Sequence, residues 1–235
     1  CNQIFYQCIF HNSRVPWRAD KVYQMMLNAP VNVLNRIGLS GSLRAVNEVE
    51  ANSVRIAGIG GGRLGEAMVV VGNLLVDFDY SLMSRVWKAP NQSFRDLALE
   101  TMEERVGTLK KLGCNHTPKL LESFLTEAFT ESLERPFYQA QLNREEIKAG
   151  RNTATGLTSG DFLSLHHPEG EVMPMKSLKI SADVFIHHIR LQFEDRGEDL
   201  SVRVDNGIIT DLKTDSPRKN NLRKILIGNP FSDWV

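Results

Sequence analysis

The sequence lacks an excess of charge of either sign, because 28 Lys and Arg balance 28 Asp and Glu over 235 residues. Without net charge there is no long-range attraction to nucleic acid or to an anionic membrane. The basic residues are also dispersed, without aromatic residues among them, and this pattern does not predict a nucleic-acid site. A polyanionic partner would therefore have to be bound by a local patch.

Cysteine is scarce, and long hydrophobic runs are missing. Cys1, Cys8 and Cys114 are too few and too scattered for a disulfide framework, and they form no C-x-x-C pair. This usage favours an intracellular, reducing compartment. No window approaches the ~18–20 apolar residues of a spanning helix, and Cys1–Phe10 is too polar for the core of a signal peptide. We therefore expect a soluble protein.

The usual patterns of catalytic and metal-binding residues are missing as well. There is no specific Ser/His/Asp order and no paired-carboxylate spacing, and Cys8 and Cys114 lack basic neighbours that would activate a thiol. The pairs His166–His167 and His187–His188 are adjacent on expected strands, where neighbouring side chains point to opposite faces. We expect satisfied or solvent-facing histidines there and assign no metal ligand.

The length suits one large domain, or a core domain with a small appendage. We expect a partial catalytic-type domain over residues 1–150, a linker over 151–175 and a small α+β domain over 176–235. The linker is suggested by Gly150–Gly160, which is rich in Gly, Thr and Ser. Because the chain begins with Cys and Gln3–Phe10 already has strand composition, we expect it to continue a longer one.

Hydrophobic periodicity predicts alternating strands and helices in the first part of the chain. Asp20 should cap a helix reaching Ile37, which Pro30 should kink or divide. Ala67–Phe78 has the composition of a central strand buried on both faces. Further strands are expected at Ile4–Phe10, Leu43–Val49 and Val54–Ile59, and helices at Ser81–Lys88, Phe94–Leu112 and Thr117–Leu133.

The tail has a different pattern, with strands at Ile180–Phe193, Leu200–Val204 and Ile208–Leu212. Asp205–Gly207 is a hairpin turn signal between the last two. A helix should begin at Thr214–Pro217, which combines a capping residue with a proline just inside.

The run Gly60–Gly65 formally satisfies the dinucleotide fingerprint G-x-G-x-x-G. That fingerprint must open a helix, whereas a strand is expected to follow here, so we reject it. No Lys-Ser or Lys-Thr follows the glycines, and the P-loop is rejected too. A glycine loop between two strands could still present backbone N–H groups to a phosphate or carboxylate. A plain hairpin connection is the alternative.

Four segments, in the correct order, resemble the lipoate-protein ligase and lipoyltransferase family. Asn47–Gly58 (NEVEANSVRIAG) is similar to the family segment N-D-L-x-v-d-g-x-K-I-s-G, and Val71–Asp77 is similar to the strand H-G-T-L-L-x-n. Leu82–Lys88 with Pro90 and Phe94–Asp96 resembles L-x-x-v-L-k-v-P-x-x-K-F-x-D. Val202–Ser216 resembles the small C-terminal domain, which carries d-G-x-I-x-x-v-x-x-T-D-S.

The resemblance implies an α/β (α+β) fold of the biotin/lipoate ligase type, with a mixed sheet and helices related to class II tRNA synthetases and a small C-terminal α+β domain. It further implies a ligase that uses ATP and Mg²⁺ to activate lipoate as lipoyl-adenylate. The lipoyl group would then pass to a lysine of an acceptor domain, in the mitochondrial matrix or the bacterial cytoplasm.

The same resemblance assigns roles to residues. Arg55 stands at the family's lysine, which approaches the carbonyl and phosphate of the acyl-adenylate. The resemblance places Asn47 and Glu48 at the nucleotide or Mg²⁺, Gly58 and Gly60 with the Gly58–Gly62 backbone at the acyl phosphate, and Gly72 and Asn73 beside the lipoyl pocket.

Two departures from the family pattern leave two hypotheses about the function. Arg55 keeps the positive charge, but its planar guanidinium cannot occupy the position of a compact ammonium. The family's arginine–arginine–glycine–glycine–glycine segment is not found in these residues. One hypothesis is an active ligase that uses Arg55; the other is a non-catalytic member serving as a structural or binding subunit of a larger assembly. An open pocket around Arg55 favours the first, and a carboxylate bound to it favours the second.

Overall fold

The computed structural model describes residues 3–165, 176–193 and 196–234. The chain divides into two compact units, one formed by Cys1–Arg135 together with Met175–Val235 and the other by Pro136–Pro174. Among the described residues, the first unit contains two β-sheets with their helices, and the second contains two helices without buried residues. The domain limits expected from the sequence stay a prediction.

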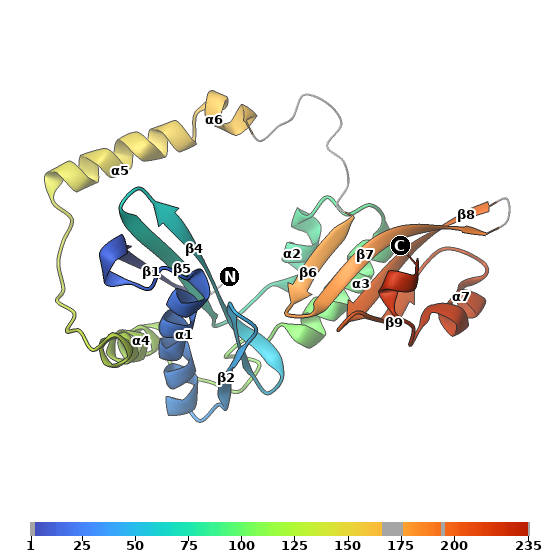
Figure 1. Ribbon diagram of the computed structural model, residues 1–235, viewed down its shortest axis with the longest axis horizontal. Coiled ribbons are helices and arrows are strands. Elements are labelled where there is room, and N and C mark those ends of the chain that lie inside the picture. Colours follow the sequence, from blue (N-terminus) through green and yellow to red (C-terminus); the bar gives the residue numbers. More distant parts are fainter. Residues whose placement is uncertain (1–2, 166–175, 194–195, 235) are drawn as a thin grey trace. The chain divides into compact units, whose positions relative to one another are not determined.

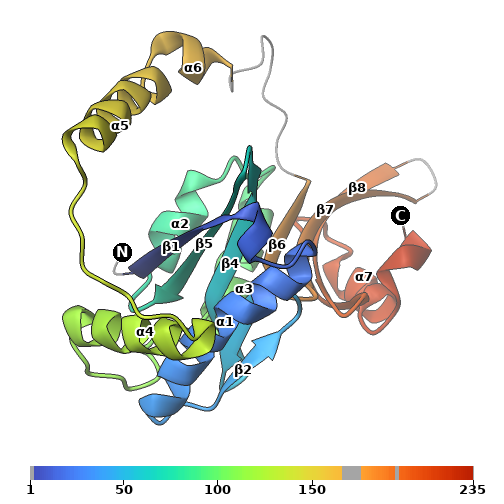
Figure 2. The ribbon, with the colours of Figure 1, turned by 60° about the vertical axis from the view of Figure 1, so that its left-hand side comes forward.

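The first sheet has five strands in the order β1-β5-β4-β3-β2, and each neighbouring pair is antiparallel. Helices α1 (Ala19–Arg36) and α4 (Pro118–Leu133) pack together on one face and build the main core with it (Figures 1 and 2). The strands are β1 (Gln3–His11), β2 (Gly41–Arg44), β3 (Glu48–Ala51), β4 (Val54–Leu64) and β5 (Ala67–Leu75).

Strand β5, expected to be the central strand, is an interior strand next to the middle strand β4, and it is not buried on both faces along its length. Met68, Val70 and Leu74 face the core, with at most 2% of their surface exposed, whereas Val71 is 42% exposed. Helices α1 and α4 cover one face of this antiparallel sheet, and β5 therefore alternates between buried and more open positions except at its end, where Leu75 belongs to the core group that includes α3. The prediction of two-sided burial was wrong for that reason.

Gly60–Gly62 belong to strand β4, not to a loop as expected. They pair with Val71, Val70 and Val69 of β5, and the chain turns at Gly65, whose φ is +58°. A Cβ on Gly61 would lie 2.4 Å from the Val69 carbonyl oxygen. The glycine run therefore permits the close approach of β4 and β5. The hairpin turn that connects these two strands is short.

A β-bulge in β4 sets the direction of Arg55. Val49 pairs with Ala57 and Glu50 pairs with Arg55, so β4 carries Ile56 as an extra residue. Ile56 and Ala57 are both fully buried. The bulge interrupts the alternation of side chains, and it places the Arg55 guanidinium beside Gly58, where an added Cβ would lie 2.6 Å from Nη2.

Several element boundaries differ from those expected. Helix α1 continues through Pro30, because buried residues on both sides of the proline, Met26 and Val33, anchor it in the core. The strand expected at Leu43–Val49 is divided into β2 and β3 by a turn in which Ala45 has a φ of 54°.

Helix α3 (Gln92–Arg105) is capped by Asn91 and ends well before Leu112. Helix α2 (Tyr80–Val86) is capped by Asp79. The predicted start of α4, with Thr117 as cap and Pro118 following it, is confirmed.

The second sheet is antiparallel, in the order β6-β7-β8-β9. Its strands are β6 (Ser177–Ser181), β7 (Val184–Phe193), β8 (Arg196–Asp205) and β9 (Ile208–Lys213), and α7 (Lys219–Leu226) follows. The predicted turn between β8 and β9 is confirmed, with left-handed Asn206 and Gly207. Buried residues of α3 contact one group of core residues in this sheet, and those of α7 contact another.

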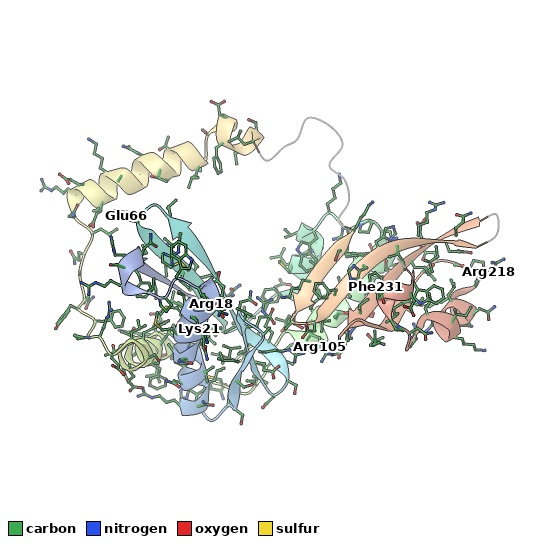
Figure 3. The ribbon with its side chains drawn as sticks, viewed as in Figure 1. Arg18, Lys21, Glu66, Arg105, Arg218 and Phe231 are labelled. Carbon is green, nitrogen blue, oxygen red and sulfur yellow. The ribbon has the colours of Figure 1, made fainter. Side chains whose placement is uncertain are left out.

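Charged residues connect α3 to the second sheet. Arg203 Nη1 and Nη2 donate to the Glu104 carboxylate, and Arg203 Nε donates to Asp205 Oδ1 at 2.8 Å. Arg105, labelled in Figure 3, donates through Nη2 to Asp205 Oδ2 at 2.7 Å. Burial alone would raise the pKa of Asp205, but the hydrogen bonds from the two arginines outweigh it and lower that pKa. The network fixes β8 against the end of α3.

The second unit consists of α5 (Arg144–Leu157) and α6 (Gly160–Ser164). Asn143 begins α5 with a capping box, in which the Glu146 side chain accepts a hydrogen bond from the Asn143 backbone. The helix continues through Gly150 and Gly156, so the linker expected from this composition is helical as far as Leu157. None of the described helices has both the length and the hydropathy needed to cross a bilayer.

Candidate active site

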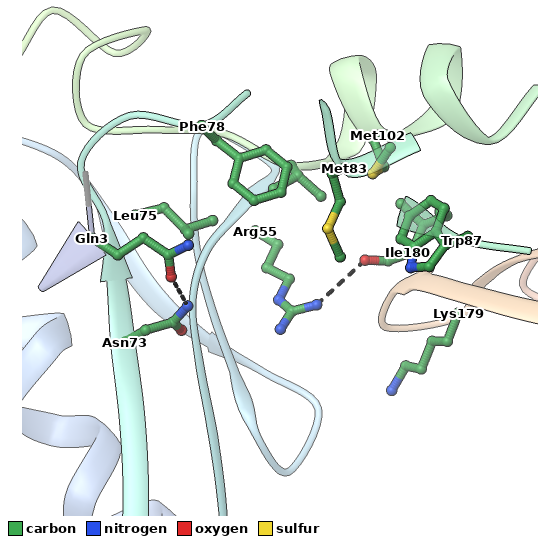
Figure 4. Close-up of a pocket in the computed structure, with 11 residues that line it drawn as sticks. Gln3, Arg55, Asn73, Leu75, Phe78, Met83, Trp87, Met102, Lys179 and Ile180 are labelled. Atoms are coloured by element: carbon green, nitrogen blue, oxygen red, sulfur yellow. Dashed lines mark hydrogen bonds between the residues drawn. The ribbon is translucent and has the colours of Figure 1, made fainter. Parts of the chain in front are cut away.

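A pocket of about 280 Å³ lies in the first unit, between strands β4 and β5, strand β6 and the segments around α2 and α3 (Figure 4). Cross-sheet contacts bring these elements together although they are distant in sequence: Arg55 and Ile180, which touch here, are 125 residues apart. The pocket is lined by Gln3, Arg55, Asn73, Leu75, Phe78, Met83, Trp87, Met102, Val106, Lys179 and Ile180.

Arg55 extends from β4 into this pocket, and 32% of its side chain is exposed. Its backbone carbonyl accepts a hydrogen bond of 2.8 Å from Gly107 N, which holds this part of β4 in place. Its Nη1 donates to the Ile180 carbonyl at 3.4 Å and lies 3.8 Å from Glu48 Oε1. The guanidinium is therefore oriented by weak contacts and keeps N–H donors that can reach a ligand.

Glu48 is nearly completely buried, with 2% exposure. Its Oε2 accepts a hydrogen bond of 2.7 Å from Ala182 N, in the turn between β6 and β7. Its Oε1 lies 3.8 Å from both Arg55 Nη1 and Lys179 Nζ. A buried carboxylate needs such partners to offset its lost hydration, and Glu48 thereby joins the first sheet to the second.

Asn73 completes the polar side of the pocket. Its Oδ1 accepts a hydrogen bond of 3.0 Å from Gly58 N, and its Nδ2 donates to Gln3 Oε1 at 2.8 Å. Gly58 has a second role, because the Cβ that it lacks would occupy the place of the Arg55 guanidinium. The structure thus brings together four of the residues expected at the site: Glu48, Arg55, Gly58 and Asn73.

The other expected residues lie elsewhere. Gly72 faces the core, where an added Cβ would lie 2.2 Å from the Tyr6 ring, and only its neighbour Asn73 faces the pocket. Asn47 is in the turn before β3 and accepts a hydrogen bond from Ile59 N through its backbone. Gly60 borders open space. Neither Asn47 nor Gly60 is among the residues that line the pocket.

Most of the pocket wall is apolar, and the sequence did not identify it. Phe78 and Trp87 flank α2, while Met102 and Val106 come from the end of α3 and just beyond it. Lys179 was missed too, because it lies just before the strand expected in the tail. The one signal in the sequence was the family-like stretch Leu82–Lys88, which contains Met83 and Trp87 but does not indicate that they form a pocket wall.

A resident metal ion does not fit the residues at this site. Both oxygens of Glu48 have protein partners. Over the described part of the chain, no group of three His, Cys, Asp or Glu residues could hold a metal ion. His187 stacks on Phe231, with ring centroids 4.3 Å apart, and His188 Nε2 lies 3.9 Å from Asp199 Oδ1. His166 and His167 lie outside the described residues.

The profile of the lipoyl protein ligase A/B catalytic domain matches residues 1–130, more than half of the chain. The chain belongs to this family. The predicted family and fold class are thereby confirmed. The neighbouring strands of the first sheet pair antiparallel, and an isolated parallel bridge joins Arg55 and Val106. No curated protein sequence matches the chain.

Solved structures of lipoate ligases share the fold of this lipoyl protein ligase A/B member. One is a bi-partite lipoate protein ligase from Thermoplasma acidophilum, whose study includes its E2 lipoyl domain; it has 20% identity and a TM-score of 0.64, covering 73% of this chain and 67% of that one. Protein Ta0514 from T. acidophilum with bound lipoic acid has 17% identity and a TM-score of 0.55, covering 68% and 64%.

A third structure, lipoate-protein ligase A bound with ATP, has 19% identity and a TM-score of 0.53, covering 64% of this chain and 60% of that one. At these identities the likeness establishes the fold. The chain spans between 60% and 67% of the length of the three solved chains.

Proposed function

We propose that this protein attaches lipoate to a lysine of an acceptor domain through lipoyl-adenylate. The observation that carries the proposal is the position of Arg55, a partly exposed cation at the polar end of a mainly apolar pocket. Lipoate has the matching chemistry, a carboxylate on an aliphatic chain. The T. acidophilum structure with bound lipoic acid and the ligase bound with ATP support the choice of substrates.

In the proposed reaction, a carboxylate oxygen of lipoate attacks the α-phosphorus of ATP, and pyrophosphate leaves. The acceptor lysine amine then attacks the acyl carbonyl, and the bond to AMP breaks. Negative charge grows on the oxygens of the acyl phosphate and of the carbonyl. Arg55 offsets that charge, because a fixed cation in a pocket partly shielded from water stabilises it strongly. Arg55 cannot serve as a base, since a guanidinium stays protonated.

The alternative is a family member that binds without catalysing transfer. The contacts of Arg55 with Glu48 and with the Ile180 carbonyl favour it, because they direct part of the guanidinium toward protein groups. At 3.8 Å and 3.4 Å these contacts are long, and we expect them to yield to a ligand carboxylate that makes shorter, charge-assisted hydrogen bonds.

A lipoylation assay tests the proposal. Full-length protein is incubated with lipoate, ATP, Mg²⁺ and an apo lipoyl domain, and the mass of the acceptor is measured. We expect modification by wild type and a reduction of about 100-fold or more in Arg55→Ala, since loss of one stabilising group typically costs that much. Arg36→Ala, which removes an exposed arginine paired with Glu127, is the matched control and should keep full activity.

Arg55→Lys distinguishes the two hypotheses further. If the ammonium of the family's lysine is the better group, this variant should equal or exceed wild type in rate. No acceptor modification by wild type, and none by Arg55→Lys, would exclude the ligase.

Gly58→Ala should uncouple stability from activity. The new Cβ would meet the end of the Arg55 side chain at 2.6 Å, and that end can move away. We expect a loss of about 1 kcal/mol in the free energy of unfolding, the lower end of the usual cost of overpacking, because the atom that the Cβ meets is the end of a flexible side chain. Lipoylation should nevertheless fall, since Arg55 leaves the pocket. A variant with unchanged lipoylation would show that the position of this guanidinium does not matter.

A further inference from the structure

Lys179 places a second cation in the Arg55 pocket, and it comes from a different sheet. Its side chain projects from β6 toward the same space as the Arg55 guanidinium (Figure 4). Its Nζ lies 3.8 Å from Glu48 Oε1, the oxygen that Arg55 Nη1 approaches at the same distance. One buried carboxylate therefore holds both cations near each other.

The two cations remain available to a ligand. Lys179 is 46% exposed and Arg55 is 32% exposed, whereas Glu48 is 2% exposed. A separation of 3.8 Å is longer than a hydrogen bond, so neither contact with Glu48 uses up an N–H donor. An anion in the pocket could accept hydrogen bonds from both without displacing Glu48, whose other oxygen is bonded to Ala182 N.

The charge of this group favours an anion. Arg55 and Lys179 are the charged members of the eleven described residues that line the pocket. With the Glu48 carboxylate beneath them, two positive charges and one negative charge leave an excess of one positive charge. A single ligand carboxylate would neutralise this excess charge. The attraction between them is stronger in a partly shielded pocket than in water.

The remaining walls favour an aliphatic body on that anion. Seven of the eleven lining residues are apolar: Leu75, Phe78, Met83, Trp87, Met102, Val106 and Ile180. A volume of about 280 Å³ is near the lower end for small-molecule sites, which suits a small acyl carboxylate better than a whole nucleotide.

We propose that Lys179 binds the carboxylate of the acyl substrate together with Arg55, so that the second sheet supplies a substrate-binding residue and completes the site. This inference rests on the proposed function, because lipoate is the ligand. The competing explanation is an ion pair between Lys179 and the buried Glu48 that only joins the two sheets. In that case Lys179 only offsets the charge of the buried Glu48 carboxylate, and its loss would lower stability but leave ligand binding unchanged.

Binding of lipoate and of lipoamide to the full chain, measured by isothermal titration calorimetry, tests the inference. Lipoamide keeps the acyl body and lacks the negative charge. We expect Lys179→Gln to weaken lipoate binding by about 10- to 100-fold, the usual effect of losing a hydrogen bond to a charged group. Binding of lipoamide should change by less than about twofold, which also shows that the variant is folded. Lys179→Arg should retain most of the affinity for lipoate.

Lys213→Gln is the matched control, because Lys213 is in the same sheet and is paired with Glu100 at 2.6 Å. It should bind lipoate as wild type does. If Lys179→Gln binds lipoate as tightly as wild type, the inference is overturned while the proposed function stands. If wild type binds no lipoate, the proposed function fails and the inference fails with it.

Discussion

Gly61→Ala is expected to destabilise the protein by about 2–3 kcal/mol, near the upper end of the usual cost of overpacking. The added Cβ would lie 2.4 Å from the Val69 carbonyl oxygen and 3.0 Å from the Val70 Cα. Both are backbone atoms of the paired strand β5, so they cannot move aside without loss of strand pairing. The free energy of unfolding in urea measures the effect.

The neighbouring glycines provide controls for that experiment. Gly60 and Gly62 also lie in β4, but a Cβ on either meets no atom within 4 Å. Neither has a positive φ, so alanine fits both positions. Alanine there should stabilise the protein by up to about 1 kcal/mol, because it restricts the unfolded chain. Equal destabilisation by all three substitutions would contradict the close approach of β4 and β5 at Gly61.

Asp205→Asn is expected to cost about 1–3 kcal/mol at neutral pH. The side chains of Asp205 and Arg203 are each 12% exposed, and Asp205 also accepts from Arg105. Removing one partner of a well-buried pair costs ~3–5 kcal/mol, and the partial exposure here reduces that figure. Asp211→Asn is the control: its pair with Arg223 has side chains 35% and 39% exposed, and its loss should cost at most about 1 kcal/mol.

Wild type and Asp205→Asn should also differ in how their stability responds to acid. The pKa of Asp205 is lower in the folded state than its ordinary value of 3.8. The carboxylate therefore contributes stability above that ordinary value, and the contribution is lost as the pH falls through the lower folded-state pKa. The difference in unfolding free energy between wild type and Asp205→Asn should be largest above about pH 5 and shrink below pH 4. A constant difference from pH 7 to pH 3 would assign the effect to packing.

The sequence was sufficient for local structure that depends on adjacent residues. The Thr117–Pro118 helix start and the Asn206–Gly207 turn follow from capping and left-handed backbone preferences, and the structure has both. The fold class was also predictable, because four family-like segments occur along the chain in the order that the family has. Arg55 was identified as the central site residue from one such segment, and its role stays a prediction.

Features that depend on distant pairing could not be predicted. The bulge at Ile56 exists because β3 and β4 pair in a shifted register, and periodicity within β4 does not contain that information. Lys179 reaches Glu48 because two sheets pack together. The prediction of a loop at Gly60–Gly62 was wrong for a related reason. Glycine occurs both in turns and where two strands approach closely, and only the partner strand distinguishes the two cases.

The hydrogen bond from Ala182 N to Glu48 joins positions 134 residues apart, and this separation orders events during biosynthesis. Strands β3 and β4 can pair early, since their residues leave the ribosome together. The Glu48 carboxylate must then stay hydrated until the turn after β6 has been made. Only at that moment does Lys179 join Arg55 beside Glu48. The pocket is therefore assembled late in synthesis, and a nascent chain stopped before β6 would leave the Glu48 carboxylate without the Ala182 N–H that it accepts from in the finished fold.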